Sequence, residues 1–247
     1  MLAARISLLC LPCAGGSAGM FMRWQRYVPH WLRIVPLELP GHGARMGEAF
    51  IEDFDALVSA LCTEHEHCTE GRYAFFGHSM GALVAYGMTM RWRRQGLSLP
   101  ACLIASASPA PAYRDPDYFA GKESDESLIA ELRKQDGTPE EVFESAEMLA
   151  ITLAALRADY RTCASYRYRP SPSLPVPIHV LAGRADSIGT DRLLAWEAET
   201  SARFSVRWFD GGHFFIRQHE SLVLSAAIQA MRSDERTQLF DAPAVGA

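Results

Sequence analysis

Six short apolar runs, separated by longer amphipathic segments, constrain the fold of this 247-residue chain more than any other feature. Such alternation is typical of βαβ units, in which the parallel strands are buried on both faces of one sheet. Apolar residues at three- and four-residue spacing predict the covering helices. We therefore expect an α/β fold with a mostly parallel central sheet flanked by helices, with strands at 5–11, 33–39, 73–77, 101–106, 177–182 and 204–209 and helices at 53–66, 80–95, 190–200 and 213–232.

One region interrupts this alternation. Residues 109–176 contain no strand pattern, only Pro-rich turns and helical patterns at 124–135 and 139–166. A segment of this length is too long for a simple connection between strand and helix. We predict that 109–176 is a helical lid inserted within a single domain spanning 1–247, although ordinary packing helices are the alternative. The apolar face of the lid would consist of Leu149, Leu153, Leu156 and Tyr160.

Composition excludes several classes of function. The net charge of −5 argues against nucleic acid as a partner, because such binding neutralises phosphates with an excess of Lys and Arg. Every apolar run is shorter than the roughly 20 residues that cross a bilayer, so no membrane association is expected. The run after Arg5 fits a buried first strand better than a signal peptide, and we expect a cytoplasmic location.

The six cysteines are scattered along the chain, which favours reduced thiols over a disulfide framework. A redox role for Cys10-x-x-Cys13 is a weaker alternative, since Cys10 falls inside an apolar strand pattern. A zinc site at the end of the first predicted helix is a second weak alternative, because its spacing matches no zinc module. The zinc alternative would use Cys62, His65, His67 and Cys68. We expect no metal and no cofactor.

The motif with the most chemical content is Gly77-His-Ser-Met-Gly81, which fits G-x-S-x-G. It follows the apolar strand pattern at 73–76 and precedes a helical pattern, and this context is what gives the motif meaning. Glycine at both flanks is required where a strand and a helix crowd against a tight turn. Ser79 is therefore the candidate nucleophile, and a structural turn is the alternative.

A serine hydroxyl needs a base, and in this kind of fold the partners follow in the order Ser, Asp, His. Asp186 follows the fifth predicted strand, and His213 follows the sixth through Asp210-Gly-Gly. Other candidates have structural interpretations, since Asp191 begins a helix, Asp159 lies inside a lid helix and Asp210 is a turn residue. Four other histidines also have structural interpretations: His179 lies in a strand, His219 lies within the last helix, and His65 and His67 lie on a polar helix end. His78 is expected to point away from Ser79. We predict a Ser79, Asp186, His213 triad.

Two backbone N–H groups are candidates for an oxyanion hole. Met80 opens the helix after the nucleophile, where the helix dipole favours negative charge. The second donor is expected in the loop after the first strand, near Ala14. That loop contains Gly15-Gly16, but it has no G-x-G-x-x-G or GK[ST] pattern, so we do not expect nucleotide binding.

These motifs together resemble the type II thioesterases that accompany nonribosomal peptide and polyketide synthases, within the α/β-hydrolase fold. The resemblance covers most of the chain. It departs from the family pattern at His42, where Arg is expected, and at Ser187, where a second acidic residue is common. The matching segments are Leu11–Ala18, Phe21–Trp24 with Val28-Pro29, Leu37–Arg45, Gly77–Gly81 and Gly211–Phe215.

The resemblance implies hydrolysis of acyl or aminoacyl thioesters from the phosphopantetheine arm of carrier proteins, which regenerates blocked synthases through an acyl-serine. It implies Ser79 as nucleophile, His213 as base, Asp186 as its orienting acid and the N–H groups of Ala14 and Met80 as the oxyanion hole. The expected partner is an acyl or peptidyl carrier domain, bound by a monomer. Arginine clusters at 91–94 and 157–169 are candidates for a basic docking face, with solvated arginines as the alternative.

Other functions remain open from the sequence. A medium-chain fatty acyl thioesterase or a small-ester esterase would use the same triad, because the elbow does not distinguish sulfur from oxygen leaving groups. Acyl transfer to an acceptor other than water is a further possibility, favoured by a lid that excludes water. A non-catalytic binding or scaffold protein of hydrolase fold is the alternative from a different class.

Overall fold

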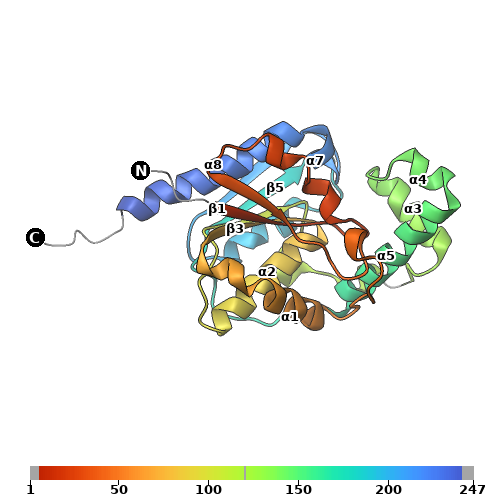
Figure 1. Ribbon diagram of the computed structural model, residues 1–247, viewed down its shortest axis with the longest axis horizontal. Helices are drawn as coiled ribbons and strands as arrows, with labels where there is room; N and C mark the ends of the chain where they lie inside the picture. Colours follow the sequence, from red (N-terminus) through yellow and green to blue (C-terminus); the bar gives the residue numbers. More distant parts are fainter. Residues whose placement is uncertain (1–5, 120, 241–247) are drawn as a thin grey trace, which may run out of the picture.

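The central sheet contains six parallel strands in the order β2-β1-β3-β4-β5-β6 (Figure 1). This computed structural model describes residues 6–119 and 121–240, with the backbone alone at Pro116 and over 233–240. All six predicted strands are present, although the second ends at Pro36 instead of residue 39. The strands are β1 (Ile6–Leu11), β2 (Leu32–Pro36), β3 (Arg72–His78), β4 (Leu103–Ser106), β5 (Ile178–Gly183) and β6 (Phe204–Phe209).

Side chains of the inner strands alternate between two separate cores, as the two-residue period of a strand requires. Tyr73 and Phe75 of β3 pack beneath α1 (Phe54–Glu64) and α2 (Met80–Arg94). Ala74 and Phe76 face the opposite side, where α8 (Glu220–Phe240) lies. Figure 1 shows α8 along one face of the sheet and α1 and α2 along the other. The edge strand β6 alternates between exposed and partly buried residues, so the expectation of burial on both faces is wrong for that strand.

Most predicted helices are present, with two interruptions. The pattern at 213–232 forms two helices separated at His219, namely α7 (Phe215–Gln218) and α8. The pattern at 190–200 becomes α6 (Thr190–Leu194) followed by the 3-10 helix η7 (Ala195–Glu199). The other 3-10 helices are η1 (Ala18–Phe21), η2 (Trp24–Arg26), η3 (Gly43–Arg45), η4 (Glu66–Glu70), η5 (Pro111–Tyr113) and η6 (Pro116–Phe119).

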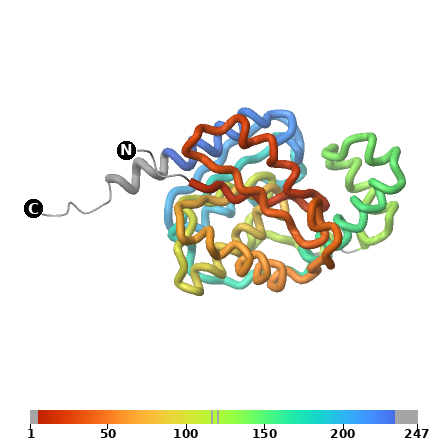
Figure 2. The backbone as a smooth tube through the Cα atoms, in the orientation of Figure 1, coloured from red at the N-terminus to blue at the C-terminus, as the bar shows by residue number. Residues whose placement is uncertain are grey.

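The segment between β4 and β5 forms a helical body at one end of the molecule (Figure 2). It contains α3 (Asp125–Gln135), α4 (Glu140–Glu144) and α5 (Ala146–Ser165). The single helical pattern at 139–166 is divided because Ser145 is extended and its side chain caps α5 by accepting from Met148 N. The predicted apolar face is present, as Leu153, Leu156 and Tyr160 pack with Leu128 and Leu132 of α3 and with the partly buried Leu149.

Within residues 6–119 and 121–240, no helix combines the length and the apolar composition needed to cross a membrane. The predicted frayed tail at 241–247 lies outside the described residues.

Candidate active site

Ser79 lies in a strained turn between β3 and α2. Its φ of 55° and ψ of −113° are rare for a residue with a side chain and cost about 1–3 kcal/mol. Contacts with a neighbouring segment hold the turn, because Ser79 N donates to Ser106 O at 2.7 Å and Arg114 Nη2 donates to Ser79 O at 3.1 Å. The turn places Ser79 on the wall of a cavity at the carboxyl end of the strands.

The flanking glycines are required by close packing. A Cβ atom at Gly77 would lie 2.3 Å from the backbone of Gly81 and Ala82. One at Gly81 would lie 2.3 Å from Leu11 O and 2.5 Å from Pro12 O in the loop after β1. Both distances are far shorter than van der Waals contact, so the turn brings α2 against the sheet only when these two side chains are absent.

Asp186 and His213 follow adjacent strands, β5 and β6. The two loops are joined by backbone hydrogen bonds from Arg184 N to Phe209 O (2.8 Å) and from Ala185 N to Gly211 O (2.9 Å). His213 Nδ1 lies 2.9 Å from Asp186 Oδ2, and the Asp186 side chain is 3% exposed. Because a carboxylate only accepts, Nδ1 carries the proton and Nε2 is left to accept one.

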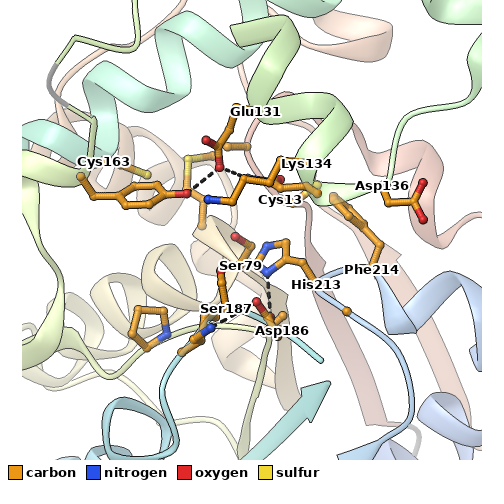
Figure 3. Close-up of a pocket in the computed structure, with 18 of the residues that line it drawn as sticks. Cys13, Ser79, Glu131, Lys134, Asp136, Cys163, Asp186, Ser187, His213 and Phe214 are labelled. Carbon is orange, nitrogen blue, oxygen red and sulfur yellow. Dashed lines mark hydrogen bonds and ion pairs between the residues drawn. The ribbon is translucent and has the colours of Figure 1, made fainter. Parts of the chain in front are cut away.

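Ser79 and His213 line the same cavity, and Figure 3 shows their side chains adjacent. Among the described residues, no hydrogen bond joins the two. Such contacts are often long in enzymes without substrate and shorten when the reaction complex forms. The structure thus brings together the three residues that the sequence singled out, from three different loops at one edge of the sheet.

His78 contributes to this site in a way that the sequence did not indicate. It is fully buried, its Nδ1 contacts Ser106 Oγ at 2.9 Å, and its ring centre lies 5.4 Å from that of His213. Burial holds the pKa of His78 well below its ordinary value, with the charge of His213 as a smaller cause. His78 is therefore neutral and adds no positive charge beside His213 when that ring gains a proton.

Ala14 and Met80, the predicted oxyanion donors, both line the cavity. Met80 is the first residue of α2, where backbone N–H groups point out of the helix. In the part of the chain that the structure describes, neither the N–H of Ala14 nor that of Met80 has an intramolecular partner. Both N–H groups are therefore available as donors in residues that line the same cavity as Ser79.

The cavity has a volume of about 490 Å³ and extends from the triad to the helical body. Cys13 and Ala14 line it from the loop after β1. Ile188 and Phe214 line it near the loops of Asp186 and His213. Residues from the segment between β4 and β5 line the opposite side, including Arg114, Tyr118, Phe119, Glu131 and Tyr160.

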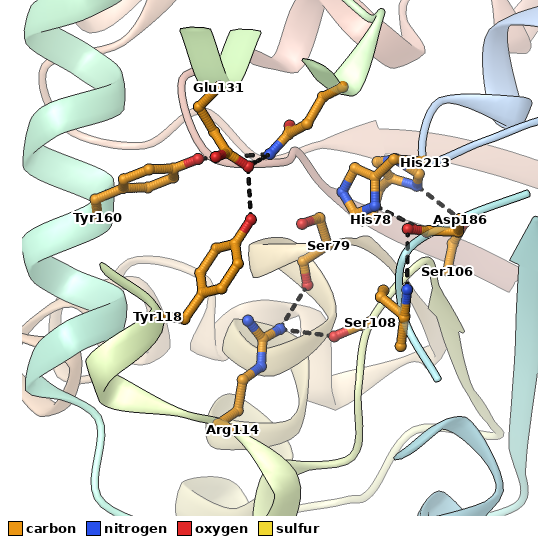
Figure 4. A network of polar contacts seen from close by, with 12 residues as sticks. His78, Ser79, Ser106, Ser108, Arg114, Tyr118, Glu131, Tyr160, Asp186 and His213 are labelled. Carbon is orange, nitrogen blue, oxygen red and sulfur yellow. Dashed lines mark hydrogen bonds and ion pairs between the residues drawn. The ribbon is translucent and has the colours of Figure 1, made fainter. Parts of the chain in front are cut away.

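Glu131 is the centre of a polar cluster on that opposite side (Figure 4). Its carboxylate accepts from Tyr118 Oη (2.5 Å), Lys122 Nζ (3.1 Å) and Gln135 Nε2 (3.1 Å). Burial opposes its ionisation, but these hydrogen bonds outweigh burial and lower the pKa of Glu131. The side of the cavity opposite the triad thus contains fixed polar groups, which sequence periodicity alone did not indicate.

A second buried cluster lies behind the glycine loop. Asp159 Oδ2 accepts from Gly15 N at 2.7 Å and lies 3.0 Å from His42 Nε2. From the sequence, Asp159 is expected only as a residue inside a lid helix. The departure from the family pattern at His42 was the one signal in the sequence that pointed to this cluster.

Five arginines of the candidate basic faces have intramolecular partners. Arg93 donates to the carbonyls of Pro172 and Ser173, and Arg167 donates to those of Ala164 and Tyr166. Three further arginines are paired with acids: Arg157 with Asp125, Arg161 with Glu52, and Arg169 with Asp55. These contacts favour the interpretation of structural or solvated arginines over a docking face.

Several known proteins are similar to this chain in sequence and in architecture. A model of the thioesterase domain family matches residues 6–230. The chain is 32% identical to the gramicidin S biosynthesis protein GrsT of Aneurinibacillus migulanus, over 93% of this chain and 90% of that protein. The chain belongs to the thioesterase family. This thioesterase is also 34% identical to thioesterase PikA5 of Streptomyces venezuelae, over 85% of this chain and 75% of that protein.

Solved structures agree with this assignment. The type II thioesterase BorB from the borrelidin biosynthetic cluster is 36% identical, with a TM-score of 0.83 and 94% of each chain covered. ClbQ from the colibactin NRPS/PKS pathway is 30% identical, with a TM-score of 0.87 over 95% of this chain and 100% of that one. The resemblance to type II thioesterases and the α/β-hydrolase fold are confirmed, and this thioesterase is a hydrolase that acts on thioesters.

Proposed function

We propose that this thioesterase hydrolyses acyl or aminoacyl thioesters on the phosphopantetheine arm of carrier proteins and thereby regenerates blocked nonribosomal peptide or polyketide synthases. The observation that carries the proposal is the 2.9 Å contact of His213 with the buried Asp186, beside Ser79 in one cavity. The names of the relatives, which include a gramicidin S biosynthesis protein and a borrelidin-cluster type II thioesterase, support the class of substrate.

In the proposed reaction, His213 Nε2 accepts the proton of the Ser79 hydroxyl while Oγ attacks the thioester carbonyl. Asp186 holds the Nδ1–H tautomer and stabilises the imidazolium that forms. The N–H groups of Ala14 and Met80 stabilise the negative oxygen of the tetrahedral intermediate. His213 then donates its proton to the leaving thiol, and an acyl-Ser79 remains.

Water completes the cycle. His213 accepts a proton from a water molecule that attacks the acyl-serine, and the acid leaves with regeneration of the Ser79 hydroxyl. No metal or cofactor is needed for either half of this reaction. We propose that 109–176 acts as the lid of a single domain, because its helices line the cavity opposite the triad.

The test compares one acyl group on three leaving groups: a carrier protein, coenzyme A and a nitrophenyl ester. We expect the highest kcat/KM on the carrier, and Ser79→Ala should lower kcat by about 10⁴- to 10⁶-fold. A preference for the simple ester would contradict the proposal and indicate an esterase. A preference set by fatty chain length alone would indicate a fatty acyl thioesterase, and absence of turnover on all three would indicate a binding protein.

A further inference from the structure

A chain of buried contacts connects the helical body to the loop that carries Ala14. Asp159, in the middle of α5, accepts from Gly15 N at 2.7 Å. The same oxygen, Oδ2, lies 3.0 Å from His42 Nε2, while His42 Nδ1 lies 3.0 Å from Pro40 O. The His42 and Asp159 side chains are 3% and 4% exposed, so water does not replace these contacts.

The two contacts of the His42 ring nitrogens need two protons. A backbone carbonyl only accepts, so the contact with Pro40 O needs a proton on His42 Nδ1. The contact between Nε2 and Oδ2 also needs one proton between its two atoms. A neutral imidazole with an ionised carboxylate has only one proton for these two contacts, and the other contact would then oppose two lone pairs at 3.0 Å. The geometry fits a His42–Asp159 pair with one extra proton, namely an imidazolium and a carboxylate.

The surrounding charges favour the same state. Burial lowers the pKa of His42, but the hydrogen bond and charge of Asp159, the Pro40 carbonyl and the charge of Glu38 together raise it above the ordinary value. Glu38 lies on the loop after β2 and accepts from Ala18 N and Ala44 N.

The other titratable groups near the pair are two buried thiols and two arginines. Burial raises the pKa of Cys13 to about 12, and it also raises the pKa of Cys163, next to Asp159 in space, to about 12. The positive charge of Arg217 acts on Cys13, where it opposes the rise in pKa. Arg217 and His42 both line a second cavity of about 710 Å³. Arg45, from η3, is paired with Glu48 and Glu64 instead of the His42–Asp159 pair. The Phe50 ring packs nearly perpendicular to the imidazole, with 5.4 Å between the ring centres.

We propose that the doubly protonated His42 and the Asp159 carboxylate position the Ala14 N–H by fastening the glycine loop to α5. The inference rests on the proposed function only in giving Ala14 the role of an oxyanion donor. Gly15, the next residue, has a φ of +69°, and its N–H is fixed by Asp159. His42 touches no substrate in this scheme, so it is a positioning residue.

The link has a defined dependence on pH. Because the pKa of His42 is higher in the folded chain than the ordinary value of about 6.5, the link is complete below that value. It is lost as the pH rises through the folded pKa. Above it, Asp159 remains as a buried carboxylate with a weakened partner, a state that is costly unless the loop or α5 moves. Activity should therefore fall on the alkaline side as His42 loses its extra proton.

The first measurement is NMR of the full-length, ¹⁵N-labelled protein across pH. We expect both ring nitrogens of His42 to show imidazolium shifts at pH 7 and to titrate above the ordinary histidine range. The Gly15 amide proton, bonded to a carboxylate at 2.7 Å, should change with the same midpoint. This readout does not depend on catalysis, so it can succeed even if the carrier-protein function proves wrong.

The second measurement is the dependence of kcat on pH. The substrate is the acyl carrier protein, the acyl coenzyme A or the nitrophenyl ester, whichever the enzyme hydrolyses. His42→Gln should lower kcat at neutral pH by roughly 10- to 100-fold, the cost of a misplaced oxyanion donor, with little change in KM. His42→Arg restores a permanent charge and is the residue that the family resemblance expects at this position. It should recover kcat and remove the alkaline decline. His67→Gln, an exposed histidine of η4, serves as the control.

Two results would overturn the inference. One is a His42 ring that is neutral at pH 7, or a Gly15 amide that does not respond to its titration. The other is an alkaline decline that persists unchanged in a folded His42→Arg variant. If neither occurs but the enzyme prefers a simple ester, then the proposed substrate fails while the positioning role of His42 stands.

Discussion

At the scale of single residues, the burial of Asp186 decides what His213 can do. The carboxylate is almost fully buried and accepts from His213 Nδ1 and, at 3.4 Å, from Ile188 N. With Nδ1 held as a donor, Nε2 is the only ring nitrogen that can accept the Ser79 proton. The proposed role of His213 as the base therefore depends on Asp186 Oδ2, which accepts the proton of Nδ1.

Replacement of Asp186 by Asn tests this dependence. The amide NH₂ would donate to Nδ1, move the ring proton to Nε2 and block proton transfer from Ser79. We expect kcat to fall by about 10⁴-fold with the fold intact. Steady-state kinetics with circular dichroism would check both points. Asp210→Asn, at the exposed turn acid paired with Arg184, should retain activity, and an active Asp186→Asn enzyme would exclude the proposed triad.

At the scale of secondary-structure elements, the turn from β3 to α2 is held by contacts with β1. The space at Gly81 is occupied by the backbone carbonyls of Leu11 and Pro12, which cannot rotate away as a flexible side chain could. The loop after β1 also carries Ala14, so the proposed nucleophile and one proposed oxyanion donor are positioned by the same contact. Any side chain at Gly81 would separate them.

We therefore expect Gly81→Ala to lower the free energy of unfolding by at least about 2 kcal/mol through overpacking. Urea denaturation would measure the change. Gly71→Ala is a matched control, because Gly71 has a φ of −116° and open space around its Cβ position. That control should change stability by less than about 0.5 kcal/mol. Equal effects at both positions would show that crowding at the elbow is not what requires glycine.

At the scale of the whole molecule, apolar residues form two large cores against the sheet and a third, smaller cluster in the helical body. The third cluster joins α3 to α5. Among the described residues, α3 contributes to neither core on the sheet, whereas α5 adds Cys163 to the core beneath α1 and α2 and is linked to the loop after β1 through Asp159. A region with few contacts to the sheet can open without unfolding it, so we expect α3 to be the mobile part of the proposed lid.

Leu128 of α3 is fully buried in that third cluster, so Leu128→Ala should weaken the lid by about 2–5 kcal/mol. Hydrogen exchange should accelerate in α3 and α5 and remain unchanged in β3. Leu222→Ala, at an exposed position of α8, provides the control. Equal acceleration in the lid and the sheet would mean that the chain unfolds as one unit and that the lid does not open separately.

The sequence by itself determined the strands, the helical insertion and the candidate triad. These features depend on local information: two-residue and 3.6-residue periodicity, a glycine on each side of Ser79, and polar residues directly after two apolar strands. Parallel strands present their carboxyl ends at one edge, so Asp186 and His213 had to lie near Ser79 once the order of the strands was known. The boundaries at Ser145 and His219 were missed, because both interrupt patterns that remain amphipathic across the break.

Only the tertiary structure decided which buried polar groups meet. Gly15 and Asp159 are 144 positions apart, and His42 and Asp159 are 117 apart, so no spacing rule connects them. The partners of Glu131 likewise include Tyr118, from a segment without a regular pattern. Periodicity reports which face of an element is apolar, but a buried charge is stable only where the fold supplies its partner. For Asp159, that partner is supplied by the packing of α5 against the loops after β1 and β2.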